Sequence, residues 1–195
     1  MLPLPTAFLP SILYFQKLLR SSFVIEINES YTKQTIRNRY EILTSNGIQL
    51  LSIPVVHGKG KKLLTKDIAI DYSTKWRVLH ARAIKTAYAS SPYFEDYYDG
   101  LTEILLKDHE FLIDKNNEML NFLFSSLDLD FSITYTSDFI TSNEANLSFN
   151  YLDKEDELEF SYQQVIGFSP SFVPNLSMID LLFNEGPMAR KLVFP

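Results

Sequence analysis

Cysteine is absent from this chain of 195 residues, and glycine stands at only six positions. Without cysteine there is no disulfide, no thiolate zinc site and no cysteine nucleophile, as is compatible with a reducing compartment. So few glycines, with neither a GxGxxG nor a Walker-type pattern, argue against a glycine-rich phosphate loop. No run reaches the roughly 18–20 apolar residues of a membrane span. We therefore expect a soluble, cytoplasmic protein without a transmembrane segment.

Positive charge is also in short supply. The chain has 18 lysines and arginines against 24 aspartates and glutamates, so its net charge is −6. Because a basic face supplies most nonspecific affinity for nucleic acid, this balance disfavours a nucleic-acid partner. Hydrophobic residues make up 46% and aromatic residues 14%, which excludes global disorder and allows an ordinary core. We expect one domain over residues 1–195, with residues 136–159 as a variable segment that is hard to interpret.

Hydrophobic runs and turn signals predict a single α/β domain with a mixed β-sheet. Strands over residues 4–9 and 23–27, separated by a helix over residues 10–19, form an N-terminal strand–helix–strand unit. Residues 35–43 and 48–56 form a β-hairpin, because the Asn-Gly pair between them is a strong tight-turn signal.

A helical segment packed on this sheet follows in the second half of the chain. Proline after serine favours helix starts, and glycine followed by proline favours helix ends. The remaining expected elements are a strand over residues 67–71, a helix capped by Ser73 or Thr74, a helix started by Ser91-Pro92, a helix over residues 115–124, a strand over residues 131–135, and a helix over residues 176–183 that stops at Gly186-Pro187.

The run Tyr31-Thr32-Lys33-Gln34-Thr35-Ile36-Arg37-Asn38-Arg39 concentrates cations in an acidic protein. On a strand, Lys33, Arg37 and Arg39 share one face. Two guanidinium groups and an ammonium would bind a pyrophosphate or carboxylate, since arginine offers two parallel hydrogen bonds. The alternative is a solvated hairpin face whose cations pair with Glu26 or Glu41.

Other polar residues near this run have two interpretations each. Asn38 points to the opposite face, where burial would require hydrogen-bond partners, so it either ties the sheet together or contacts a ligand. Tyr31 is a candidate for ligand contact. The loop with Lys59, Lys61 and Lys62 either adds to the anion site or is a solvated connection.

His80 lies one turn after Trp76 on the apolar face of its expected helix. An imidazole is the natural general base near neutral pH, although a lone histidine on an apolar face is usually a core residue. Trp76 is a second candidate for ligand contact. A three-histidine metal site is disfavoured, because His57, His80 and His109 have no zinc-type spacing.

Asp180 and Asn184 are four residues apart, so they share one face of the last helix. Together they could hold a sugar hydroxyl or orient a base. The alternative for Asn184 is a helix cap formed with Gly186. No Gly-x-Ser-x-Gly motif is present, so nucleophilic serine chemistry has no support.

Four blocks in order give the chain a resemblance to a known family. They cover about two-thirds of the sequence, and their combination is specific. The blocks are Phe8-Leu9-Pro10 with Tyr14-Phe15; Tyr31-x-Lys33-Gln34-x-x-Arg37-Asn38-Arg39 with Gly47 and Leu51-x-Ile53-Pro54-Val55; Ile70-Asp71 with Trp76, His80, Tyr88 and Ser91-Pro92-Tyr93-Phe94; and Gln164, Gly167-Phe168 and Pro174-Asn175-Leu176-Ser177-x-Ile179-Asp180-Leu181-Leu182-Phe183-Asn184-Glu185-Gly186. The chain resembles the WbqC-like protein family of bacteria.

This resemblance implies a role in surface-polysaccharide and O-antigen synthesis. It suggests transfer of a small acyl or aminoacyl group, such as glycyl, to a sugar carried on a nucleotide or lipid diphosphate. Lys33, Arg37 and Arg39 would then hold the diphosphate, and His80 or Asp180 would take the proton from the attacking amine. No cofactor is expected beyond the donor of that group.

A non-catalytic carbohydrate- or nucleotide-binding module, or an accessory partner of glycan enzymes, is the competing interpretation. Two departures from the family favour it. Pro5-Thr6-Ala7 stands where many relatives carry glutamine or His-Gln, and the stretch 136–161 is short and unlike that of longer relatives. A helper protein that docks through an aromatic surface is a third alternative.

Overall fold

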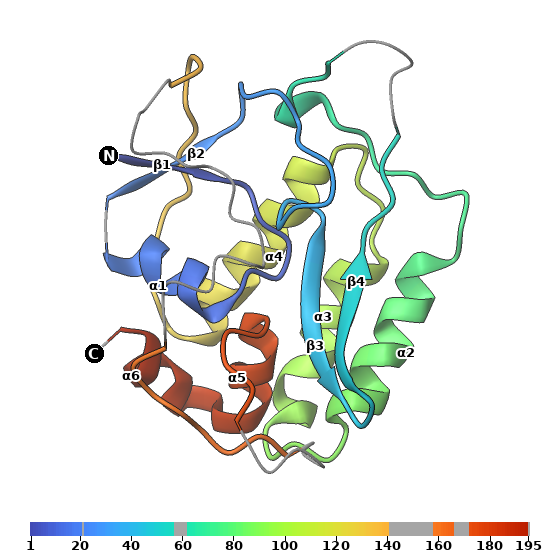
Figure 1. Cartoon of the computed structure of the whole chain (residues 1–195), viewed down its shortest axis with the longest axis vertical. Coiled ribbons are helices and arrows are strands. Elements are labelled where there is room, and N and C mark those ends of the chain that lie inside the picture. The colour runs from blue at the N-terminus through green and yellow to red at the C-terminus, as the bar shows by residue number, and fades with distance from the viewer. Residues whose placement is uncertain (21, 57–61, 141–157, 166–171, 195) are drawn as a thin grey trace.

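Two small sheets with helices packed around them make up the fold (Figure 1). Strands β1 (Leu2–Pro5) and β2 (Phe23–Glu26) pair in parallel, and helix α1 (Ile12–Arg20) connects them. The expected strand–helix–strand unit is therefore confirmed, with its first strand placed earlier in the chain than predicted. The computed structural model describes residues 1–20, 22–56, 62–140, 158–165 and 172–194.

A third extended segment runs parallel to β2 on its other side. The Ile25 amide donates to the Thr134 carbonyl at 2.8 Å, and the Thr136 amide donates to the Ile25 carbonyl at 3.0 Å. These contacts make an isolated bridge between Ile25 and Tyr135, where a full strand over residues 131–135 was expected. The carboxyl ends of all three segments consequently meet at one edge.

The β-hairpin consists of β3 (Arg39–Thr44) and β4 (Gly47–Ser52) and forms its own two-stranded sheet. Gly47 has φ +101°, a conformation that favours glycine and lets the chain turn tightly. Side chains of β3 alternate, with Tyr40 fully buried and Arg39 half-buried. The α/β class is confirmed, and the described strands form two separate pairs.

Most of the helices follow the hairpin in the chain, and their N-termini differ from expectation. Helix α2 starts after Lys75, so the prediction of a Ser73 or Thr74 cap is wrong. The Asp71 carboxylate instead accepts a hydrogen bond from the Ser73 amide at 2.8 Å. The helices are α2 (Trp76–Tyr88), α3 (Phe94–Leu106), α4 (Leu112–Ser126), α5 (Met178–Glu185) and α6 (Ala189–Val193), with 3-10 turns η1 (Thr65–Asp67) and η2 (Gly186–Met188).

The segment over residues 67–71 does not form the expected strand. It leaves η1 and makes single bridges, between Val55 and Ile70 and between Ala69 and Phe111. Gly186 ends α5 as predicted, with φ +53°. No helix among the described residues is long and apolar enough to cross a membrane.

Aromatic side chains join the layers of the core. The rings of Phe15 and Phe124 lie 5.5 Å apart between α1 and α4, and Phe124 stacks on Phe131 at 5.3 Å. On the other side, Phe183 of α5 packs at 5.3 Å against both Tyr88 and Phe94. The contacts of Phe183 join α2, α3 and α5, and so fix the polar residues of these helices that are described next.

Candidate functional site

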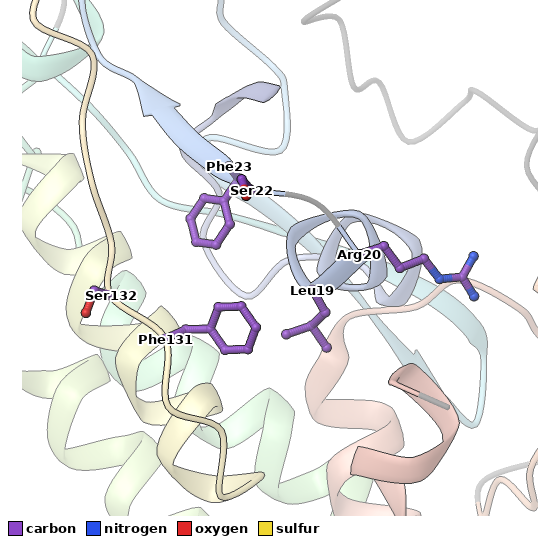
Figure 2. A pocket seen from close by; sticks show the side chains of 6 residues that line it. All are labelled: Leu19, Arg20, Ser22, Phe23, Phe131 and Ser132. Carbon is purple, nitrogen blue, oxygen red and sulfur yellow. The ribbon is translucent and has the colours of Figure 1, made fainter. Parts of the chain in front are cut away.

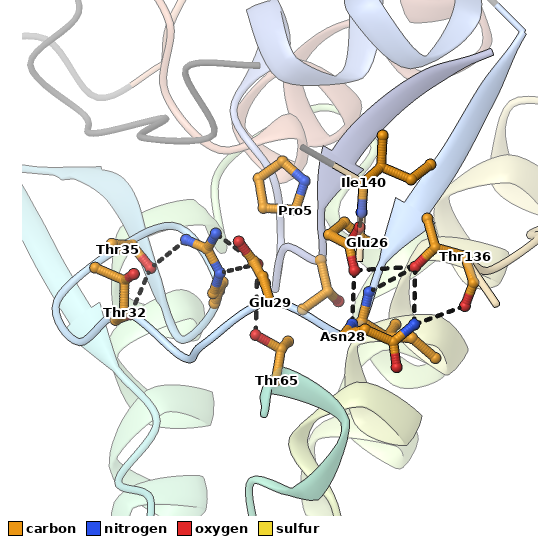
Figure 3. A network of polar contacts seen from close by, with 12 residues as sticks. Pro5, Glu26, Asn28, Glu29, Thr32, Thr35, Thr65, Thr136 and Ile140 are labelled. Atoms are coloured by element: carbon orange, nitrogen blue, oxygen red, sulfur yellow. Dashed lines mark hydrogen bonds and ion pairs between the residues drawn. The ribbon is translucent and has the colours of Figure 1, made fainter. Parts of the chain in front are cut away.

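Polar side chains gather at the edge where β1, β2 and the 134–136 segment end (Figure 3). Glu26 is completely buried, and its carboxylate accepts hydrogen bonds from the Asn28 amide at 2.6 Å, the Thr136 hydroxyl at 3.0 Å and the Ile140 amide at 3.0 Å. Each oxygen of this buried carboxylate has a donor. Glu26 therefore fixes residues 136–140 to the end of β2.

Arg37 lies inside the protein beside this edge and not on a strand face. Its side chain is 1% exposed, and its Nε and Nη2 atoms lie 2.7 and 2.6 Å from the Glu29 carboxylate. Nη1 also donates to the Thr35 hydroxyl at 3.0 Å, and Thr65 donates to Glu29 at 3.4 Å. Burial raises the pKa of Glu29, and the Arg37 guanidinium acts in the opposite direction.

The predicted common strand face of Lys33, Arg37 and Arg39 is wrong, because β3 starts only at Arg39. Residues 31–38 form a loop that turns Lys33 into solvent and Arg37 into the core. Arg37 pairs with the Glu29 carboxylate, whereas Glu26 or Glu41 was the expected partner of these cations. A role of these cations in binding a ligand stays a prediction.

This loop lies beside residues 62–64, which follow the other lysines of the chain's second basic stretch. Ser30 bridges antiparallel to Leu64, and the Tyr31 amide donates to the Leu63 carbonyl at 2.9 Å. Because residues 30–33 and 62–64 run antiparallel, exposed Lys62 lies beside the residues that lead to Lys33. Lys59 and Lys61 lie outside the described residues.

Three polar side chains complete the surroundings of Arg37. The Tyr31 hydroxyl is buried without a hydrogen-bond partner among the described residues, and burial raises the pKa of Tyr31 to about 12 against the lowering influence of Arg37 and Arg39. The Asn38 side chain donates to the Ile53 carbonyl at 2.8 Å, which ties this loop to the end of the hairpin. Arg39 is half-buried and its Nε donates to the Ser52 hydroxyl at 3.2 Å.

His80 is buried on the other side of β3, between α2 and the hairpin. Its Nδ1 lies 3.1 Å from the Tyr40 hydroxyl, and its ring packs edge-on against Trp76 at 5.2 Å. Burial lowers the pKa of His80 to about 4, with a hydrogen bond to the Ser52 backbone acting in the opposite direction. Trp76 is 3% exposed and donates to the Asp71 carbonyl at 3.1 Å, so both residues belong to the core of this protein.

Asp180 and Asn184 lie at a third place, on the inner face of α5. The Asp180 carboxylate is completely buried and accepts hydrogen bonds from Tyr88 at 2.9 Å, from Gln164 at 3.0 Å and from Tyr162. Burial raises the pKa of Asp180, while the three donors act in the opposite direction. The Asn184 side chain donates to the Asp180 carbonyl at 2.7 Å and accepts from the Val165 amide at 3.2 Å.

The structure thus brings together Tyr31, Lys33, Asn38 and Arg39 around the buried Arg37, and keeps the two expected bases apart. His80 bonds to Tyr40, whereas Asp180 bonds to Tyr88, which lies two turns further along α2. Eight residues of helix correspond to roughly 12 Å. His80 and Asp180 therefore do not form one catalytic pair.

Several residues of these polar clusters were not predicted from the sequence. Glu26 is the last residue of an apolar strand and Glu29 follows it, and a carboxylate at the end of a parallel strand is a signal that was available. Asn116 of α4 gave no such signal, although its side chain donates to the Arg37 carbonyl at 2.9 Å and to the Thr6 hydroxyl at 3.0 Å. Its position becomes meaningful only once α4 is packed beneath the loop.

A shallow hollow of about 410 Å³ lies at the opposite, amino end of β2 (Figure 2). Leu19, Phe23 and Phe131 face one another across it, whereas the Arg20 side chain points away. Its lining is mixed, with Arg20, Ser22 and Ser132 beside the three apolar residues. None of the residues expected from the sequence to bind substrate lines this hollow.

Comparisons with known proteins agree with the resemblance drawn from the sequence. The WbqC-like protein family matches residues 6–157 and 142–192. The uncharacterized protein Rv1507c of Mycobacterium tuberculosis (strain ATCC 25618 / H37Rv) is 30% identical over 201 residues, which cover 86% of this chain and 85% of that protein. No solved structure matches this chain. The chain therefore belongs to the WbqC-like protein family, which is linked to polysaccharide biosynthesis.

Proposed function

We propose that this protein serves surface-polysaccharide synthesis by binding a sugar linked to a nucleotide or lipid diphosphate. Lys33, Arg39 and Lys62 hold the diphosphate. The observation that carries this proposal is the contact between residues 30–31 and 63–64, because it supports placing Lys62 near the basic run around Lys33 on the surface of an acidic protein. Cations on a rigid support attract a polyphosphate and fix its position.

The buried ion pair supports this surface from below. Arg37 is held by Glu29, so its part is to fix the loop that presents Lys33, not to contact phosphate. The Tyr31 hydroxyl is buried at the same loop without a partner among the described residues, and a shift of this loop would let it donate to a phosphate or sugar oxygen. An arginine that is already paired has few donors left for a ligand.

A thermal-shift screen against nucleotide sugars, nucleoside diphosphates and free sugars tests the proposal. Ligands that contain a diphosphate should raise the melting temperature by mass action, and free sugars should not. Arg39→Ala should remove most of that shift, whereas Lys191→Ala, an exposed cation on α6, should leave it unchanged. An equal shift in Arg39→Ala, or no shift with any diphosphate, would contradict the proposed site.

Transfer of a small acyl or aminoacyl group to the bound sugar is a second candidate function, favoured by the Asp180 cluster. The amine nitrogen of the sugar attacks the donor carbonyl, a C–N bond forms, and the ester or thioester bond of the donor breaks. The proton leaves through the half-buried Tyr162 hydroxyl to Asp180, whose raised pKa makes it a better base than an exposed aspartate. The same route then returns this proton to the departing oxygen or sulfur of the donor, which leaves as an alcohol or thiol. The low pKa of His80 makes it a weaker base at neutral pH.

Mass spectrometry of the sugar product tests this second function. Asp180→Asn should lower turnover by about 10²–10⁴-fold, the usual contribution of a general base. Tyr162→Phe should also lower it, and Asp138→Asn, at an exposed carboxylate, should not. Unchanged turnover in Asp180→Asn would refute the base, and binding without any product would leave the protein as a non-catalytic binding module.

A further inference from the structure

Helices α2 and α3 are neighbours that carry charge of opposite sign. Every charged residue of α2 is basic, and every charged residue of α3 is acidic. The charged side chains exposed here are Lys75, Arg82 and Lys85 on or just before α2, and Glu95, Asp96, Asp99 and Glu103 on α3. This separation by sign is unusual, because surface helices generally mix the two signs.

None of these seven exposed charges takes part in an ion pair with another described residue. Arg77 is the exception on α2, since it pairs with Asp108 and donates to the Leu106 carbonyl at 2.6 Å. The contact between the helices is made elsewhere, where the Tyr98 hydroxyl donates to the Ala81 carbonyl at 3.1 Å. The seven charges therefore face outward.

Apolar side chains accompany these charges. Val78 is 41% exposed and Leu79 is 59% exposed between the cations of α2, and Leu106 is 45% exposed at the end of α3. The hairpin packs on α2 through the contact between Tyr40 and His80, and Val78, Leu79 and Leu106 remain exposed. The cations span about 15 Å along α2 and the acids span about 12 Å along α3. The two charged rows thus match in length.

We propose that two copies of this chain associate through this face, each laying α2 on the α3 of the other. A two-fold axis makes every contact twice, so one surface must contain both complementary halves. An acidic partner or an anionic membrane would attract α2 but would be repelled by the four acids of α3. The second copy satisfies both helices and covers Leu79. This inference does not depend on the proposed function.

Analytical ultracentrifugation of the wild type and five variants tests the association. The wild-type chain should be a dimer whose dissociation constant rises with salt. Arg82→Glu/Lys85→Glu reverses two of the three exposed cations on or just before α2, and Asp99→Lys/Glu103→Lys reverses two of the four exposed acids of α3. Each should weaken the dimer by about tenfold or more, because the substituted side chains repel their counterparts on both sides of the axis. An equimolar mixture of the two variants should form a heterodimer, since each substituted pair then meets a pair of opposite sign.

The four-fold variant, with both pairs of substitutions in one chain, should recover the homodimer. Lys191→Glu and Asp130→Lys, at exposed positions on α6 and after α4, should dimerise like the wild type. Circular dichroism establishes that each variant is folded. A monomeric wild type at low salt, or folded variants that stay dimeric alone, would overturn the proposal. Failure of the mixture to associate would overturn the two-fold arrangement.

Discussion

Acidification should destabilise this protein through His80, a residue that carries no charge in the core. Burial lowers the pKa of His80 to about 4, against an ordinary value of about 6.5 in the unfolded chain. Between these two values the unfolded state binds a proton that the native state does not. The free energy of unfolding must therefore fall as the pH is lowered through this window.

The size of the effect follows from the width of the window. The difference of about 2.5 pH units corresponds to about 3 kcal/mol once the pH reaches 4, and the loss is about 1.4 kcal/mol per unit near pH 5. The side chain is 5% exposed, so little solvent screening reduces this figure. Raised pKa values of Glu29 and Asp180 work in the opposite direction, so only a comparison between variants isolates His80.

Urea unfolding of the wild type and of His80→Gln at pH 7, 6, 5 and 4.5 measures this comparison. Glutamine keeps a donor and an acceptor for Tyr40 and the Ser52 backbone but does not titrate in this range. The wild type should lose stability faster than the variant as the pH falls. Trp76 is the chain's one tryptophan and lies beside His80, so its fluorescence reports protonation directly. If the stabilities of the wild type and His80→Gln change with pH in parallel, the imidazole of His80 is not buried in its neutral form. A midpoint near pH 6.5 in the fluorescence titration of Trp76 would contradict burial of the neutral imidazole as well.

Two further predictions concern stability. Arg37→Met should lower the free energy of unfolding in urea by about 3–5 kcal/mol, because it leaves the buried Glu29 carboxylate unpaired. The double variant Arg37→Met/Glu29→Met should recover part of this loss. If the single and double variants lose the same free energy, the two side chains are not coupled. Gly186→Ala should lower the melting temperature more than Gly47→Ala. Both glycines have positive φ, but a Cβ at Gly186 would lie 2.5 Å from the Tyr93 ring and one at Gly47 meets nothing within 4 Å. Similar melting temperatures would contradict this geometry.

Local signals in the sequence were enough to predict most elements. The apolar run of β2, the Asn-Gly turn of the hairpin and the 3.6-residue periods of the helices depend on neighbouring residues only. The start of β3 could not be predicted in this way. Glu29 decides whether residues 35–38 extend a strand or turn inward. It lies outside the basic run of residues 31–39 and accepts a hydrogen bond from the Arg37 side chain. A tertiary contact overrides the strand pattern there.

The sequence predicts which residues gather in the candidate site, but it does not predict how these residues are arranged in space. The basic run around Lys33 is visible in the sequence, but its contact with the stretch before Leu64 depends on a backbone bridge. Asp180 and Asn184 share a helix face as their spacing predicts. The hydroxyl of Tyr88, 92 residues away from Asp180, comes from another helix and has no local signal.

Isothermal titration of a nucleotide-diphosphate sugar into the wild type and into Lys33→Gln/Lys62→Gln tests the central claim most directly. Both lysines are exposed, so the double variant should fold with unchanged stability. Its dissociation constant should be at least about tenfold weaker, with a shallower dependence on salt, because two charge-assisted contacts to phosphate are lost. Lys191→Gln should bind like the wild type. Equal affinity and equal salt dependence in the double variant would contradict a diphosphate site on this surface.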